Sequence, residues 1–217
     1  MTDSTGFHGA YFATRLGPDR RRETLWRHLT RYLARDVRAE GSVLELGAGY
    51  CYFINGIHGR RRVAVDLGEQ VSRCAAPGVE AINADALAFL RQTPAGTFDF
   101  VFASNFLEHF DWPTLTVMLA EIRRVITPGG QLALVQPNFR LAPGRYFDDY
   151  THRTIFTDVS LSDWLAADGF EVVTCVPRFL PLTVKSRFGG LSFLVPLYLR
   201  SPWRPLAGQM FVLARRR

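Results

Sequence analysis

The chain has 217 residues, of which 47% are hydrophobic and 21% are charged, which is the length and composition of one globular domain with a substantial core. Its net charge of +6 does not indicate a nucleic-acid-binding protein, because among the 26 basic residues only Lys185 is lysine and all others are arginine. That skew favours a genome-wide codon bias over a binding face. The arginine runs at 20–22, 60–62 and 215–217 are interpreted as solvated surface.

The cysteines and the apolar segments predict a location for the protein. Cys51, Cys74 and Cys175 are odd in number and have no metal-ligand spacing, which fits a reducing compartment. The first residues lack the basic-then-apolar pattern of an export signal. The longest apolar stretch, near 189–199, is far shorter than the roughly 20 residues that span a bilayer. We therefore expect a cytoplasmic protein.

An amphipathic helix is predicted from about Arg20 to Arg38, because apolar residues recur there at helical spacing. Those residues are Leu25, Trp26, Leu29, Tyr32, Leu33 and Val37. No linker or internal repeat follows. We predict a single domain over residues 1–217, in which residues 1–40 form an N-terminal helical cap and residues 41–217 form the core.

A strand, a glycine turn and a helix are predicted next. Residues 43–46 are an apolar run that holds one acid, Glu45, and the run breaks into Gly47-Ala48-Gly49. Such a turn lets the backbone approach a nucleotide-like ligand closely, although it is also compatible with an ordinary strand-to-helix connection. The dinucleotide fingerprint would place a third glycine at Tyr52, where a tyrosine obstructs the approach to a pyrophosphate. The pattern therefore favours a ligand without a pyrophosphate.

Acidic residues end the next two predicted strands. Asp66 ends the strand 62–66, 21 residues after Glu45, and is placed to bind the two hydroxyls of a ribose. Asp85 ends the strand 81–85, where contacts to an adenine ring are expected. The order of these strand ends along the chain makes a chance match improbable.

The remaining elements complete an alternation of strands and helices. Strands are predicted at 98–105, 131–135, 170–176 and 209–214, and a Pro-Gly-Gly turn precedes the second of them. Helices are predicted at 113–126 and at 160–168, the latter with a capping box of Ser160 and Asp163 and with Gly169 at its end. We predict an α/β fold with a doubly wound, mostly parallel sheet, and the closing pair suggests an antiparallel strand at its edge.

These features resemble a class I S-adenosylmethionine-dependent methyltransferase from about Leu25 to Val212. The glycine loop, the acids at 66 and 85, the Phe-Asp-Phe-Val-Phe block and the Pro-Gly-Gly turn carry the resemblance. It implies a seven-stranded, Rossmann-like sheet with an antiparallel last strand. Three segments, Gly-Ala-Gly-Tyr-Cys, Ser-Asn-Phe-Leu-Glu-His and Tyr-Phe-Asp-Asp-Tyr-Thr-His, are similar to a bacterial, type 11-like subgroup associated with surface-glycan or lipid-linked sugar assembly.

The resemblance implies S-adenosyl-L-methionine as the cofactor and places its site beyond the carboxyl ends of the strands. The residues expected to bind the cofactor are those of the glycine loop and of the following strand ends: Glu45, Gly47, Ala48, Gly49, Asp66, Leu67, Asp85, Ala86, Ser104 and Asn105. Protein side chains then align donor and acceptor, exclude water and in some cases take up a proton.

Two histidines are candidate general bases toward a hydroxyl acceptor. His109 follows the fourth strand, and His152 lies in a long loop, 146–152, of the kind that is usually functional. Each also fits a structural role, His109 in a turn and His152 as a clip to a neighbouring aspartate. A metal site of Asp148, Asp149 and His152 lacks evident companion ligands, so no metal site is predicted. Residues expected to bind the substrate are Asn138, Tyr146, Asp149 and Tyr150.

The segment 185–204 mixes basic and aromatic side chains on an apolar body. It fits a helix packed on the sheet or a dimer surface, and also a peripheral contact with the inner face of a membrane. The acceptor expected from the resemblance is a hydroxyl or an amine (O- or N-methylation) on a small-molecule, sugar-like or lipid-linked compound, not a nucleic acid. The sequence leaves open a nicotinamide-dependent oxidoreductase and a non-catalytic S-adenosylmethionine-binding protein, and it does not determine the oligomeric state.

Overall fold

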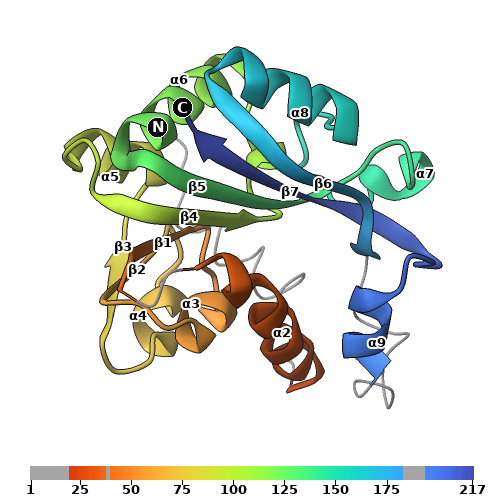
Figure 1. Cartoon of the computed structure of the whole chain (residues 1–217), viewed down its shortest axis with the longest axis horizontal. Coiled ribbons are helices and arrows are strands. Elements are labelled where there is room, and N and C mark those ends of the chain that lie inside the picture. The colour runs from red at the N-terminus through yellow and green to blue at the C-terminus, as the bar shows by residue number, and fades with distance from the viewer. Residues whose placement is uncertain (1–19, 38–39, 183–193) are drawn as a thin grey trace.

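The computed structural model describes residues 20–37, 40–182 and 194–217. Within this part of the chain, helices cover both faces of one seven-stranded sheet (Figure 1). The strands are β1 (Ser42–Leu46), β2 (Arg61–Asp66), β3 (Val79–Asn83), β4 (Phe98–Ser104), β5 (Ile126–Pro137), β6 (Phe170–Pro181) and β7 (Ala207–Arg216). The helices are α2 (Arg20–Leu33), α3 (Tyr52–Gly56), α4 (Gln70–Cys74), α5 (Ala86–Gln92), α6 (Trp112–Val125), α7 (Pro143–Tyr146), α8 (Asp158–Ala167) and α9 (Val195–Arg200), with 3-10 turns η1 (Ala34–Asp36) and η2 (Leu107–His109).

The sheet has the order β3-β2-β1-β4-β5-β7-β6. Strands β1 to β5 pair in parallel, and β7 runs antiparallel to both of its neighbours. The predicted doubly wound, mostly parallel sheet with an antiparallel last strand is confirmed. The closing pair forms an antiparallel edge of the sheet: β6 is the edge strand and pairs antiparallel with β7, which lies between β5 and β6.

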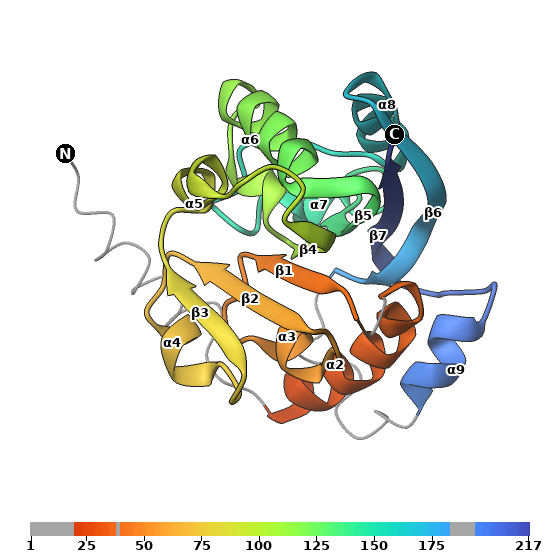
Figure 2. The ribbon, with the colours of Figure 1, turned by 60° about the vertical axis from the view of Figure 1, so that its left-hand side comes forward.

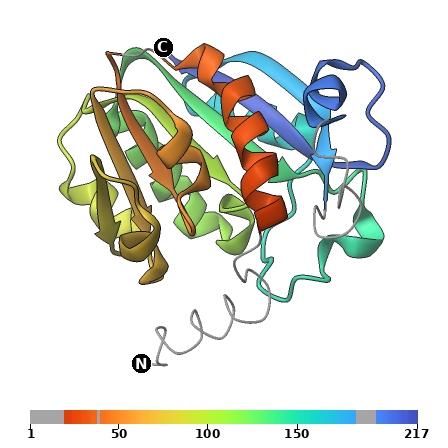
Figure 3. The same cartoon turned by 90° about the horizontal axis from the view of Figure 1, so that it is seen from below.

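Among the described residues, two hydrophobic cores lie on opposite faces of the sheet, beneath the two groups of helices that Figure 2 shows on either side of it. Helices α5, α6 and α8 cover one face, where Leu115, Met118 and Leu119 of α6 are fully buried. Helices α2, α3 and α9 cover the other, and α2 runs across it (Figure 3). Leu25, Leu29 and Leu33 form the buried stripe of α2, as its spacing predicted. The helix ends at Leu33, and η1 follows it.

Helix α8 begins earlier than the sequence indicated. Thr157, not Ser160, is its N-terminal cap: the Thr157 hydroxyl accepts from the Ser160 amide at 3.0 Å, and the Ser160 hydroxyl accepts from the Thr157 amide at 2.9 Å. The sequence pattern places the N-terminal cap three residues too late, because Ser160 also fits the capping-box pattern with Asp163. Gly169 has a φ of +88° and ends the helix as predicted.

The Pro-Gly-Gly segment is an irregularity inside β5 and not a separate turn before it. The register of β4 against β5 shifts between Phe98 and Phe100, opposite this segment. Gly130 has no room for a side chain, because an added Cβ would lie 2.9 Å from the carbonyl oxygen of Asp99. None of the helices in the described part of the chain combines the length and the apolar character that crossing a bilayer requires.

Candidate active site

The residues that end β1, β2, β4 and β5 lie along one edge of the sheet, since these strands are parallel. In open α/β sheets ligands bind beyond the carboxyl ends of the strands. The structure therefore brings the glycine loop after β1, Asp66 of β2 and the η2 turn after β4 to one region.

The glycine loop is a tight, left-handed turn. Gly47, Gly49 and Cys51 have φ values of +67°, +50° and +58°. The amides of Gly47 and Ala48 both donate to the carbonyl oxygen of Val65, at 2.9 and 3.1 Å, and tie the loop to β2. Glycine adopts such angles without the steric cost that a side chain brings, which explains why glycine occupies two of these three positions.

Asp66 lies directly against this loop. Its Oδ2 accepts from the Gly49 amide at 2.8 Å, and its Oδ1 accepts from the Gly68 amide at 2.7 Å. The side-chain amide of Gln70 also donates to Oδ1, at 3.5 Å, so three donors orient this carboxylate beside the loop. The acid and the loop, 17 residues apart in sequence, therefore form one ligand-facing unit.

Glu45 and Asp85 each anchor a helix. Glu45 is buried in β1, and its Oε2 accepts from the Ile54 amide at 3.0 Å, while burial raises its pKa well above the usual range. Asp85 caps α5, and its Oδ1 accepts from the Ala88 amide at 2.9 Å. Beside these two acids, Leu67 is exposed after β2, and Ala86 is buried in the first turn of α5.

The turn after β4 contacts the glycine loop. Asn105 has a φ of +48°, and its backbone amide donates to the Val135 carbonyl at 2.8 Å. The side-chain amide of Asn105 donates to the Ser104 hydroxyl. Phe106 then covers Gly47: a Cβ added to Gly47 would lie 2.5 Å from Cδ2 of the Phe106 ring. The absence of a side chain at Gly47 is what allows this contact.

Glu108, His109 and His152, here called the Glu-His cluster, meet where β4 ends. Oε1 of Glu108 lies 4.0 Å from Nε2 of His109 and 3.8 Å from Nε2 of His152. Glu108 is fully buried, and this burial raises its pKa to about 8. Burial, and then the neighbouring His152, lowers the pKa of His109 to about 4. This trio has the donor types and the proximity to hold a metal ion.

The loop that carries His152 is docked on the η2 turn by backbone hydrogen bonds. The amides of Arg153 and Thr154 both donate to the Glu108 carbonyl oxygen, at 2.8 and 3.1 Å. The Thr154 hydroxyl donates to the Phe110 carbonyl at 2.6 Å. These bonds bring together the two predicted catalytic histidines, which are 43 residues apart in sequence.

The residues predicted to bind substrate occupy different environments. Asn138 is buried, and its amide donates to Asp158 and to the Pro177 carbonyl. Tyr146 is also buried, and its hydroxyl donates to the Thr154 carbonyl at 2.6 Å, so both side chains hold the local fold. Asp149 accepts from the Thr151 hydroxyl beside the cluster, and Tyr150 is exposed.

Glu108 and Gln136 lie in the segments that the sequence predicted to surround the site, but neither was given a role there. Gln136 is fully buried in β5, and in the orientation that satisfies both groups its side-chain nitrogen donates to Oε2 of Glu108. The sequence contains one signal for each residue. Gln136 is a polar residue at the end of an apolar strand, and Glu108 is an acid directly before a histidine.

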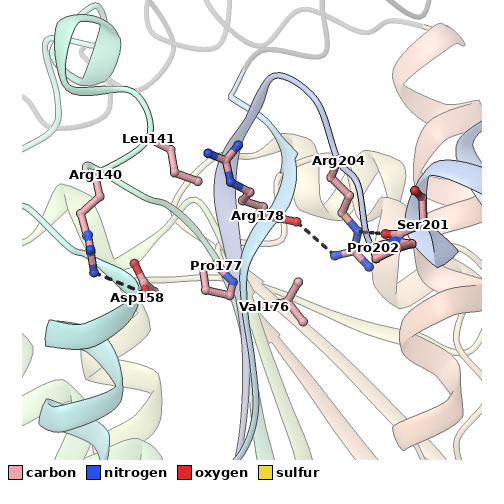
Figure 4. Close-up of a pocket in the computed structure, with 9 residues that line it drawn as sticks. All are labelled: Arg140, Leu141, Asp158, Val176, Pro177, Arg178, Ser201, Pro202 and Arg204. Carbon is pink, nitrogen blue, oxygen red and sulfur yellow. Dashed lines mark hydrogen bonds and ion pairs between the residues drawn. The ribbon is translucent and has the colours of Figure 1, made fainter.

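A cavity of about 580 Å³ lies away from the glycine loop, between the segment after β5 and the turn before β7 (Figure 4). Its lining is rich in arginine and includes Arg140, Leu141, Asp158, Val176, Pro177, Arg178, Ser201, Pro202 and Arg204. Arg140 lies 3.8 Å from the Asp158 carboxylate, and Arg204 donates to the Arg178 carbonyl at 3.1 Å.

Comparison with known proteins gives a consistent family. The family model described as a methyltransferase domain matches residues 19–175. A search of curated proteins gave no match. An S-adenosylmethionine-dependent methyltransferase of Archaeoglobus fulgidus has a similar structure, with a TM-score of 0.69 and 18% sequence identity. The match covers 97% of this chain and 99% of that chain.

Two further solved structures are similar over nearly the whole chain. A possible histamine N-methyltransferase of Thermotoga maritima has a TM-score of 0.63 at 17% identity, covering 98% of this chain and 95% of its own. The 1,6-didemethyltoxoflavin N1-methyltransferase of Burkholderia thailandensis, solved with S-adenosylhomocysteine and its substrate, has a TM-score of 0.62 at 20% identity, covering 97% and 85%.

The fold and the glycine-loop site are those of a class I methyltransferase. The chain belongs to the methyltransferase-domain family, since the family model covers more than half of it. Its cofactor is S-adenosylmethionine, and the structure fits that ligand: a left-handed turn with glycine at 47 and 49 stands against the carboxylate of Asp66. Membership of this family decides against the oxidoreductase that the sequence had left open.

The glycine loop yields a first prediction. Gly47→Ala places a Cβ against the Phe106 ring in a left-handed conformation, so we expect the free energy of unfolding to fall by about 1–2 kcal/mol. We also expect S-adenosylmethionine to bind at least about tenfold more weakly, because the loop must shift at the ligand. Calorimetric titration and urea denaturation measure the two effects.

Gly96→Ala is the matched control. Gly96 is also left-handed, with a φ of +63°, but an added Cβ there meets nothing within 4 Å. It should lose less stability than Gly47→Ala, because only the left-handed conformation is unfavourable there, and it should keep cofactor affinity. Equal cofactor affinity in both variants would remove the loop from the binding site.

Proposed function

We propose that this methyltransferase transfers a methyl group to a hydroxyl of a small-molecule acceptor, either a sugar-like molecule or a lipid-linked sugar. One observation carries the proposal: a fully buried carboxyl group faces two imidazoles at the carboxyl edge of the sheet, next to the glycine loop. A hydroxyl must lose its proton during transfer, and such a cluster of proton-binding groups is suited to that task. A neutral amine needs only alignment.

The donor side of the proposed reaction is the glycine loop with Asp66. Bound S-adenosylmethionine supplies a methyl group on a positively charged sulfur, which is activated for displacement. We propose that Asp66 accepts hydrogen bonds from the ribose hydroxyls, and that Asp85 and Leu67 line the adenine position. The ring of Phe106 lies over Gly47 and would exclude water between the donor and the Glu-His cluster.

The acceptor side is the Glu-His cluster and the loop docked on it. His152 is the side chain that we expect to matter most for removing the hydroxyl proton, because its loop reaches from β5 over the end of β4. Tyr150 and Asp149 of the same loop are proposed to contact the acceptor.

The ribose assignment gives a second prediction. Asp66→Asn replaces one of the two carboxylate oxygens by an NH2 group, which donates and cannot accept from a ribose hydroxyl. We expect the free energy of S-adenosylmethionine binding to become less favourable by roughly 1–3 kcal/mol, the cost of leaving such polar groups unpaired. Calorimetric titration measures it. Glu69→Gln removes an exposed charge three residues away, which pairs with Arg73, and should leave affinity unchanged. If Asp66→Asn binds as the wild type does, the ribose contact lies elsewhere.

The acceptor site gives a third prediction, which tests the proposed function itself. Small molecules and lipids that gain a labelled methyl group in cells containing the protein, and not in cells lacking it, identify the acceptor. With that acceptor, His152→Gln should lower turnover roughly 10²–10⁴-fold and leave S-adenosylmethionine affinity unchanged. An amine product, or full turnover by His152→Gln, would refute the hydroxyl assignment. Detecting no methyl transfer at all would favour a non-catalytic binding protein.

The lipid-linked alternative rests on an exposed apolar surface around α9. Trp203, Leu197 and Leu206 are 78%, 68% and 63% exposed. The arginine-lined cavity adjoins them through Ser201, Pro202 and Arg204, and guanidinium groups suit an anionic head group (Figure 4). Part of the predicted membrane segment, 185–193, lies outside the described residues. We propose that this surface contacts the inner face of a membrane.

This surface gives a fourth prediction. Trp203→Ala should weaken sedimentation with anionic liposomes, because an amphipathic ring is lost from the contact, and should not change S-adenosylmethionine affinity. Val159→Ala, which trims an exposed apolar side chain of α8, is the control. Equal liposome association of Trp203→Ala and wild type, or strong salt-sensitive RNA binding in place of liposome association, would contradict the membrane contact.

A further inference from the structure

The Glu-His cluster contains a buried carboxylate oxygen whose surroundings suit a cation. In the described part of the chain, Oε1 of Glu108 accepts no hydrogen bond, although the side chain is fully buried. The other oxygen, Oε2, faces the side-chain amide of Gln136. Buried carboxyl groups are normally paired, hydrogen-bonded or coordinated to a metal. Oε1 is instead directed between the two imidazoles.

The ring orientation of His109 is held from behind. The Thr151 hydroxyl lies 2.6 Å from Oδ1 of Asp149 and 2.9 Å from Nδ1 of His109. Thr151 has one hydroxyl proton, which it donates to Asp149, so Nδ1 of His109 must be the donor in its own contact. Neutral His109 then carries its lone pair on Nε2, the nitrogen that faces Glu108. This arrangement is the usual one for a metal-binding histidine.

His152 is held by packing and by the docked loop. Its ring packs edge-on against Tyr146, with centroids 4.8 Å apart, and lies 5.2 Å from the ring of His109. Its side chain is 9% exposed, whereas that of His109 is 24% exposed, so the cluster opens to solvent on one side. One ligand atom from each of the three residues lies within 4.8 Å of the others.

We propose that Glu108, His109 and His152 bind one divalent transition-metal ion, such as Mn²⁺, Co²⁺ or Zn²⁺. Two imidazoles and one carboxylate suit these ions better than Mg²⁺ or Ca²⁺, which prefer oxygen ligands throughout. Three protein ligands on one side leave coordination positions open toward the partly exposed side of His109. The proposal replaces the expectation from sequence that the protein has no metal site.

The inference rests on the proposed function and specifies how the cluster activates the acceptor. A hydroxyl oxygen that binds the ion loses its proton to water more readily, because the ion stabilises the oxyanion. That oxygen then forms the new bond to the methyl carbon as the bond from carbon to sulfur breaks, which leaves a neutral thioether. In this form of the proposed function, His152 aids the loss of the hydroxyl proton as a ligand of the ion, and the proton passes to water. The acceptor class is therefore an alcohol, and a vicinal diol could chelate the ion.

Metal binding can be measured without any acceptor. Protein freed of metal with a chelator is titrated with Co²⁺ while its visible absorption is recorded, and with Mn²⁺ and Zn²⁺ by calorimetry. We expect one site per chain. Glu108→Gln and His152→Gln should bind at least about 100-fold more weakly, and Asp149→Asn, which disturbs the Thr151 contact behind His109, about 10–100-fold more weakly. His58→Gln, at an exposed histidine elsewhere, is the control and should bind normally.

S-adenosylmethionine titration and thermal melting of each variant separate the outcomes. Asp149 is only partly buried, so its variant keeps the test valid if Glu108→Gln does not fold. Absence of stoichiometric metal binding by wild-type protein that does bind S-adenosylmethionine would overturn the metal site and leave the proposed function standing. Metal binding that survives in Glu108→Gln and Asp149→Asn would also overturn it. Metal binding without S-adenosylmethionine binding would refute the proposed function instead.

Discussion

The backbone carbonyl of Glu108 is the point on which the candidate site depends. It accepts two hydrogen bonds from the loop after β5, through the amides of Arg153 and Thr154. This docking holds His152 against the side chain of Glu108. Glu108 therefore has two roles: its backbone carbonyl fixes the loop, and its carboxyl group faces the imidazoles. The Thr154 hydroxyl, which donates to the Phe110 carbonyl, adds a third hydrogen bond to this docking.

The parallel sheet places this cluster next to the donor site. Strands β1 and β4 are neighbours that end at the same edge of the sheet. The turns that follow these two strands are therefore in contact, and the ring of Phe106 packs on Gly47. Two residues after Phe106 comes Glu108. The donor loop and the acceptor cluster are therefore joined by one short, rigid connection, which suits a reaction whose main requirement is alignment of two bound groups.

Much of this arrangement was predictable from local sequence. The apolar runs with terminal acids predicted the strands, and helical spacing predicted α2 and α6. The insertion of β7 between β5 and β6 was not predicted, because the pairing of strands depends on contacts between segments that are far apart in the sequence. Likewise, nothing near Glu108 in sequence shows that its carboxyl meets Gln136 and His152, which pair through tertiary packing.

A structure of the protein crystallised with S-adenosylhomocysteine tests the central claim most directly. If donor and acceptor sites adjoin as described, the ribose hydroxyls lie at Asp66, and the thioether sulfur lies between Gly47 and the Glu-His cluster. A ligand bound at the glycine loop with its sulfur directed away from Glu108, His109 and His152 would contradict the account, because no methyl group on that sulfur could reach an oxygen held by the cluster.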